Sequence, residues 1–214
     1  FSSLANSLTV SSNFLITNEA ILLNDYETAA SYFSNDLSLD INILEEKKKL
    51  ISFVNADQFK QAVEVANRII KFGINDENSW MVYLVDAKLN NKTQPFNEFE
   101  SLDSRFNIIN KFENIKYAFY NDNNIEEHNH NIASSLLEIV QGSISQSINQ
   151  EGNFMYFFFY LNLILNLSPE FNEAIFLQAQ FFQHLKYYDK AERIYNTIQP
   201  NHSLYLEAQK NIAI

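Results

Sequence analysis

The stretch NDYETAASYF, residues 24–33, decides the fold because its pattern occurs twice more along the chain. The second occurrence is ADQFKQAVEVA at 56–66, and the third is KYYDKAERIY at 186–195. In each copy an aromatic residue stands three positions before an alanine, and the three alanines are Ala29, Ala62 and Ala191. A small residue lets two helices cross closely, so the pattern predicts a recurring antiparallel pair of helices.

Extending this register places units that begin near residues 10, 43, 77, 138 and 172. The first two alanines are 33 positions apart, and Trp80, the only tryptophan, takes the fourth position of the third unit. Pro169 stands where the second helix of the fourth unit would end. The unit resembles the tetratricopeptide repeat, a helix–turn–helix of 34 residues. That resemblance implies an all-α, right-handed α-solenoid of stacked antiparallel helix pairs.

We therefore expect one domain over residues 1–214, with a degenerate region between its third and fourth full units. The expected units lie near 10–42, 43–76, 77–110, 111–137 (a degenerate helical pair), 138–171 and 172–202, with the start of a further helix at 203–214. A polar loop is expected at 121–131, and a helix break near Gly142. The apolar face of 203–214 has no paired helix after it, which predicts that the chain is part of a longer array.

The segment 153–213 carries the more specific resemblance, to large alphaproteobacterial tetratricopeptide proteins. Its SPEF turn at 168–171, the YDKA helix and the Pro200–Ser203 linker are the matching features. The resemblance implies a bacterial, alphaproteobacterial origin. It leaves open a cytoplasmic location or export to the periplasm or cell envelope after loss of a signal peptide.

Composition narrows the classes of function. Only 3 glycines and 3 prolines occur, which disfavours turn-rich β folds and phosphate-binding loops. The net charge of −11 opposes nucleic-acid binding, and the absence of cysteine removes disulfides and thiolate chemistry. The longest apolar run, 154–167, has 14 residues, so a buried helix explains it better than a membrane span.

A solenoid of this kind is an extended docking surface, so the resemblance implies a non-enzymatic scaffold that binds a protein or peptide. The alternative is a structural segment of a longer repeat protein that self-associates or supports a larger envelope complex. No cofactor is expected, and a homo-oligomer remains open. The family pattern places a candidate peptide-binding groove on seven residues: Phe14, Asn18, Lys48, Gln146, Gln180, Gln183 and His184.

Amide side chains in such a groove can pair with the backbone of an extended peptide, although solvated amides are also common in a chain this rich in asparagine. Some family members hold the C-terminal carboxylate of chaperones in a groove of this kind. The corresponding slots here are Phe14, Asn18, Lys48, Asn78 and Val82, a partial match that disfavours that client.

Two further clusters have ordinary explanations. His128 and His130 lack a third ligand at a recognisable spacing, so a solvated loop is expected in place of a metal site. The run EEKKKL at 45–50 is expected to be a solvated helix face, with a patch for an acidic partner segment as the alternative. No nucleophile elbow occurs, and adjacent carboxylates on a helix do not converge, so no catalytic residues are predicted.

Overall fold

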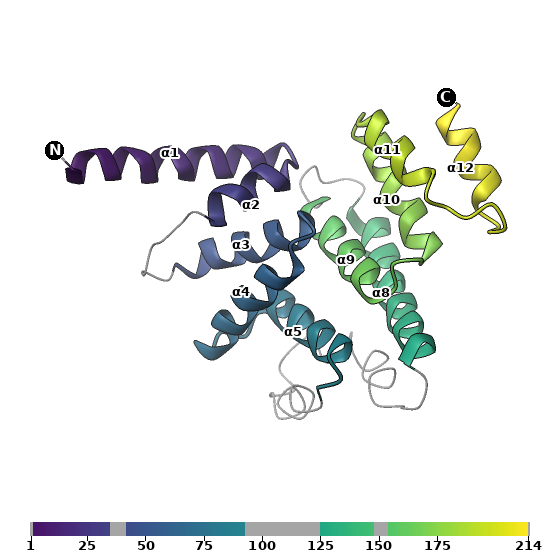
Figure 1. The fold of residues 1–214 in the computed structure, drawn as a ribbon, viewed down its shortest axis with the longest axis horizontal. Helices are drawn as coiled ribbons and strands as arrows, with labels where there is room; N and C mark the ends of the chain where they lie inside the picture. Colours follow the sequence, from purple (N-terminus) through teal and green to yellow (C-terminus); the bar gives the residue numbers. More distant parts are fainter. Residues whose placement is uncertain (1, 35–41, 93–124, 148–153, 214) are drawn as a thin grey trace. The chain divides into compact units, whose positions relative to one another are not determined.

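The computed structural model describes residues 2–34, 42–92, 125–147 and 154–213 (Figure 1). These residues form ten α-helices and no strand. The helices are α1 (Ser2–Leu22), α2 (Tyr26–Ser34), α3 (Ile43–Asn55), α4 (Phe59–Lys71), α5 (Glu77–Leu89), α8 (Ile125–Ser147), α9 (Phe154–Leu167), α10 (Asn172–His184), α11 (Tyr188–Tyr195) and α12 (Tyr205–Ile212).

The chain divides into two compact units. Among the described residues, the first unit contains α1 to α5 and the first residues of α9, and the second contains α8, the rest of α9 and α10 to α12. Consecutive helices pack in pairs: α1 with α2 and α3 with α4 in the first unit, and α10 with α11 in the second. This confirms the predicted all-α, solenoid-like class.

The three alanines of the recurring pattern are buried, as predicted. Ala29 and Ala62 have no exposed surface, and Ala191 is 2% exposed. Each lies on the second helix of a pair, where the absence of a larger side chain lets the two backbones approach. The residues four positions later, Phe33, Ala66 and Tyr195, are also buried.

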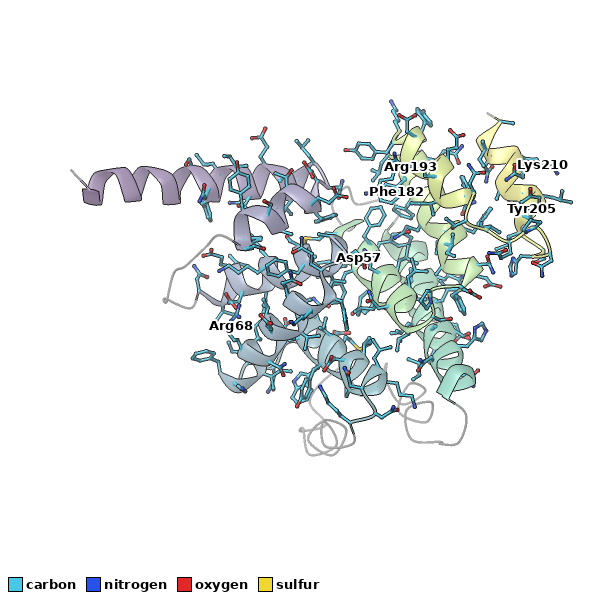
Figure 2. The ribbon with its side chains drawn as sticks, in the orientation of Figure 1. Asp57, Arg68, Phe182, Arg193, Tyr205 and Lys210 are labelled. Atoms are coloured by element: carbon cyan, nitrogen blue, oxygen red, sulfur yellow. The ribbon has the colours of Figure 1, made fainter. Side chains whose placement is uncertain are left out.

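The helix ends repeat as regularly as the alanines. Asn24, Asp57 and Asn91 all have positive φ, and they are 33 and 34 residues apart. Each lies just after a helix, and the next amide donates back to the helix, as Gln58 N does to Phe53 O at 2.8 Å. This is the Schellman arrangement, which satisfies the last carbonyls of the helix. Figure 2 labels Asp57 in the turn between α3 and α4.

The same turn between α10 and α11 is formed by Lys186, with φ of 66°. A left-handed conformation costs an L-residue with a Cβ about 1 kcal/mol, and lysine lacks the local hydrogen bonds that help asparagine there. We expect Lys186→Gly to raise the free energy of unfolding by about 0.5–1 kcal/mol in urea denaturation. The control Glu192→Gly, within α11, should lower it by about 1 kcal/mol. A loss of stability in Lys186→Gly would contradict the assigned turn.

The charged run at 45–50 is not the solvated face that its sequence predicts. Glu46 is 5% exposed and Lys49 is 7% exposed. Arg68 of α4, labelled in Figure 2, donates from Nε and Nη2 to Glu46 Oε2 at 3.0 and 2.8 Å. Lys49 Nζ lies 3.4 Å from Glu46 Oε1 and 5.8 Å from the ring centroid of Phe33 on α2. This buried cluster ties α3 to α2 and α4.

Two other sequence expectations are also wrong. Helix α8 begins at Ile125 and continues to Ser147, so 125–131 is helical and no break occurs at Gly142. A mostly polar stretch such as 125–131 is compatible with a helix as well as with a loop, and a single glycine costs a helix only about 1 kcal/mol. Ile132 and Leu136, one turn apart, are fully buried and anchor this helix.

The apolar run at 154–167 is a buried helix, as predicted. Seven of its side chains are buried: Phe157, Phe158, Phe159, Leu161, Leu163, Ile164 and Leu167. In the first unit, Asn55 Nδ2 donates to Met155 O at 3.1 Å, which attaches the start of α9 to the end of α3. No helix in the described part of the chain is long and apolar enough to cross a membrane.

Tyr26, at the start of α2, gives the first unit a pH dependence. Its hydroxyl donates to Asn24 Oδ1 at 3.0 Å. Burial raises the pKa of Tyr26 well above its usual value, and a hydrogen bond with Asn55 partly offsets this shift. The folded state therefore disfavours the tyrosinate, so its contribution to stability is complete below about pH 10, the pKa of an unfolded tyrosine, and is lost as pH rises above it.

We expect Tyr26→Phe to cost about 1 kcal/mol at pH 8 through the lost hydrogen bond. The same variant should lose less stability than the wild type between pH 9 and pH 11, because it has no hydroxyl to ionise. Urea unfolding at several pH values measures both effects, with the exposed Tyr187→Phe as the control. If the free energies of unfolding of the wild type and Tyr26→Phe fell in parallel with pH, Tyr26 would not be the group that causes the loss of stability at high pH.

Candidate functional site

Three of the predicted groove residues converge in the first unit. Lys48 Nζ of α3 lies 2.5 Å from Asn18 Oδ1 of α1, across 30 residues of sequence. The same ammonium lies 5.6 Å from the ring centroid of Phe14, one turn earlier on α1. We call this set, Phe14, Asn18 and Lys48, the α1–α3 site.

Local sequence explains why the three residues meet. Phe14 and Asn18 are four positions apart, so they share a face of α1. Helix α3 begins at Ile43 because Asn42 accepts hydrogen bonds from the amides of Leu44 and Glu45 at 3.0 and 3.4 Å. That cap fixes the register in which Lys48 faces α1.

Asn18 uses its amide within the protein. Its Nδ2 donates to Phe14 O at 2.7 Å, and its Oδ1 accepts from Lys48. Asn18 therefore positions the lysine, in contrast to the expected role of pairing with a peptide backbone. The residues that a ligand can reach are Phe14, which is 55% exposed, and Lys48, which is half-buried.

The three consecutive lysines of α3 have different partners. Lys47 Nζ lies 2.8 Å from Asp76 Oδ1, whose other oxygen accepts from Ser79 N and caps α5. Lys49 lies beside Glu46 in the buried cluster. Among the described residues, the polar partner of Lys48 is a neutral amide. The site thus presents a positive charge beside an aromatic ring.

The apolar surface around the site was not predicted from the sequence. Leu15 and Leu22 of α1 are 68% and 82% exposed, and both lie on the side of the helix that carries Phe14 and Asn18. Leu44, one turn before Lys48 on α3, is 66% exposed. The signal that could have indicated Leu22 is the spacing of 14, 18 and 22, which places two apolar residues and an amide on one stripe of α1.

The predicted groove residues of the second unit are arranged differently. Gln180 and His184 are exposed on α10, and His184 lies 6.4 Å from the Phe181 ring. Gln183 belongs to an internal network: its Oε1 accepts from Tyr195 Oη at 3.1 Å, and its Nε2 donates to Asn211 O at 3.3 Å. Gln146 lies on α8, but its side chain is outside the described set.

The network around Tyr195 joins three helices of the second unit. Asn211 Nδ2 of α12 donates to Tyr195 Oη at 3.1 Å. Burial raises the pKa of Tyr195, the hydrogen bond from Asn211 lowers it, and the charge of Glu207 raises it further. The phenol therefore acts as a neutral hydrogen-bonding group that holds α12 against α10 and α11.

Two other candidate arrangements have little support. Val82, which the family pattern would place in a site for the C-terminal carboxylate of chaperones, is fully buried in α5 and therefore cannot contact a ligand. His130 lies on α8 with its ring 4.8 Å from that of Phe171. No group of three or more metal-ligating side chains gathers in the part of the chain that the structure describes.

Comparisons of the chain with protein-family models, curated proteins and solved structures returned no match. The tetratricopeptide resemblance therefore stays a prediction from sequence, and the function has to be argued from the α1–α3 site itself.

Proposed function

We propose that the protein is a non-enzymatic scaffold that binds a protein or peptide partner through the α1–α3 site. One observation carries the proposal: Phe14, Asn18 and Lys48, predicted as groove residues, come together on two helices and leave an aromatic ring 55% exposed beside an ammonium. Exposed aromatic residues next to a positioned charge are the kind of group on which binding energy concentrates at interfaces.

The rest of the site agrees with binding in place of catalysis. Within the described residues the three site side chains include no nucleophile–base pair and no carboxylate. A lysine held by an amide and an aromatic ring can attract and orient a partner. We therefore propose a recognition surface of the tetratricopeptide type, with no cofactor.

Affinity purification from a lysate of the native cells tests this proposal. The wild type should retain a set of proteins that the variant Phe14→Ser loses, because the exposed ring supplies the apolar contact. The control is Phe72→Ser, which removes an equally exposed phenylalanine after α4. Equal retention by all three proteins would contradict a binding role for the α1–α3 site.

A second candidate is a structural segment that self-associates or supports a larger assembly. Leu206 of α12 favours it, since this large apolar side chain is 72% exposed. Light scattering at increasing concentration should then show a dimer or larger species that Leu206→Ser abolishes. A monomer at all concentrations would argue against this alternative.

A further inference from the structure

The partner of the α1–α3 site can be specified further from the charges around Lys48. Of the lysines at 47, 48 and 49, the first pairs with Asp76 at 2.8 Å and the third lies 3.4 Å from Glu46. Lys48 instead contacts Asn18 Oδ1 and faces the Phe14 ring. Within the described residues, the contacts of its ammonium are thus a neutral amide oxygen and an aromatic ring, with no ion pair.

An ammonium has three N–H donors, and Asn18 accepts one of them. The ring of Phe14 attracts the charge, but 5.6 Å is near the outer limit for a cation–π contact. A carboxylate would make a charge-assisted hydrogen bond with a remaining donor, which is roughly twice as strong as a neutral one. The chemistry therefore favours an acidic ligand group at Lys48.

The exposed apolar residues of α1 and α3 near Lys48 favour a ligand that has apolar groups next to its carboxylate. Phe14, Leu15 and Leu22 on α1 are 55%, 68% and 82% exposed, and Leu44 on α3 is 66% exposed. The net charge of −11 repels a polyacidic segment at long range, so one carboxylate among apolar side chains fits better than an acidic tract.

We infer that the α1–α3 site binds a peptide segment in which an internal aspartate or glutamate side chain is flanked by aliphatic residues. The inference rests on the proposed function and names the class of its partner. Lys48 receives the carboxylate, Asn18 holds the ammonium in place, and Phe14 with the exposed leucines covers the aliphatic groups.

A random nine-residue peptide library, with each peptide fused at its C-terminus so that no terminal carboxylate is free, tests the inference. It is selected separately on the full chain, on Lys48→Gln and on Lys60→Gln, an exposed lysine of α4 that serves as the control. Wild type and Lys60→Gln should enrich peptides with one acidic residue between aliphatic ones, and Lys48→Gln should lose that preference.

The best enriched peptide, synthesised with an amidated C-terminus, is then titrated by fluorescence anisotropy. Changing its acidic residue to the corresponding amide should weaken binding to the wild type about tenfold and leave binding to Lys48→Gln unchanged. Lys48→Arg, which keeps the charge, should retain most of the preference. Urea unfolding of Lys48→Gln checks that the variant is folded.

The possible failures are distinguishable. The inference would be overturned if the enriched peptides had no acidic residue, or if Lys60→Gln lost the preference for an acidic residue as fully as Lys48→Gln. Either result would leave the proposed function standing. No enrichment on the wild type over a bare surface would contradict the proposed function itself.

Discussion

Replacing Glu46 by glutamine is expected to lower the free energy of unfolding by about 3 kcal/mol. Glu46 is 5% exposed, and its carboxylate is the shared partner of Arg68 on α4 and Lys49 on α3. The neutral amide removes the negative charge that lies 3.4 Å from the Lys49 ammonium, in a lysine side chain that is only 9% exposed. The effect lies at the lower end for buried ion pairs because the Arg68 side chain is 45% exposed and can hydrate.

Glu45→Gln is the matched control, since it removes the same charge from a neighbouring position that is 33% exposed. It should cost less than about 1 kcal/mol. Urea denaturation of both variants, with Arg68→Met in single and double combination, separates the pair from its surroundings. A double variant whose loss equals the sum of the single losses would show that Glu46 and Arg68 are not coupled.

Ala62→Leu is expected to destabilise the first unit by about 1–3 kcal/mol. Ala62 has no exposed surface, and α4 packs on both α3 and α5, so three added carbon atoms have to force neighbouring side chains or the helix itself aside. The expected loss appears as a lower midpoint in thermal or urea unfolding followed by circular dichroism.

Gln61→Leu provides the comparison, because it introduces the same side chain at an exposed position of the same helix. Its effect should stay within about 0.5 kcal/mol. If the two leucine variants unfold alike, the alanine at 62 does not mark a helix crossing, and the repeat register drawn through Ala29, Ala62 and Ala191 fails.

The helical class and the crossing positions could be predicted because they depend on local periodicity. A small residue three positions after an aromatic one is visible in sequence at Ala29, Ala62 and Ala191, and all three are buried. The positive-φ residues Asn24 and Asp57 follow the same register, since each ends the first helix of a pair.

The buried charges could not be predicted in the same way. Glu46 and Lys49 look like surface residues within EEKKKL, and their burial depends on Arg68 and Phe33, which belong to other helices. Ion pairing between helices has no local signature in the sequence, so the prediction that the charged run is a solvated helix face was wrong. The start of α8 at 125–131 was missed for a related reason, because this stretch is mostly polar and the apolar residues that mark the helix, Ile132 and Leu136, lie further along it.

The α1–α3 site was predicted in part. The family pattern selected Phe14, Asn18 and Lys48, and the structure brings these three together. It does not show Gln183 as a free groove residue, because Tyr195 and Asn211 occupy its amide. The partners of the Gln183 amide are the Tyr195 hydroxyl, 12 residues away, and the Asn211 backbone carbonyl, 28 residues away, and spacing alone does not reveal them.

Photo-crosslinking tests most directly whether the α1–α3 site binds a partner. A photoreactive phenylalanine analogue replaces Phe14 in one preparation and Phe72 in another, two ring positions that are 55% and 58% exposed. Each preparation is irradiated in a lysate of the native cells and analysed by gel mobility and mass spectrometry. The proposed function predicts a discrete covalent adduct from position 14 and none of comparable yield from position 72. Adducts of equal yield from both positions, or none from position 14, would contradict it.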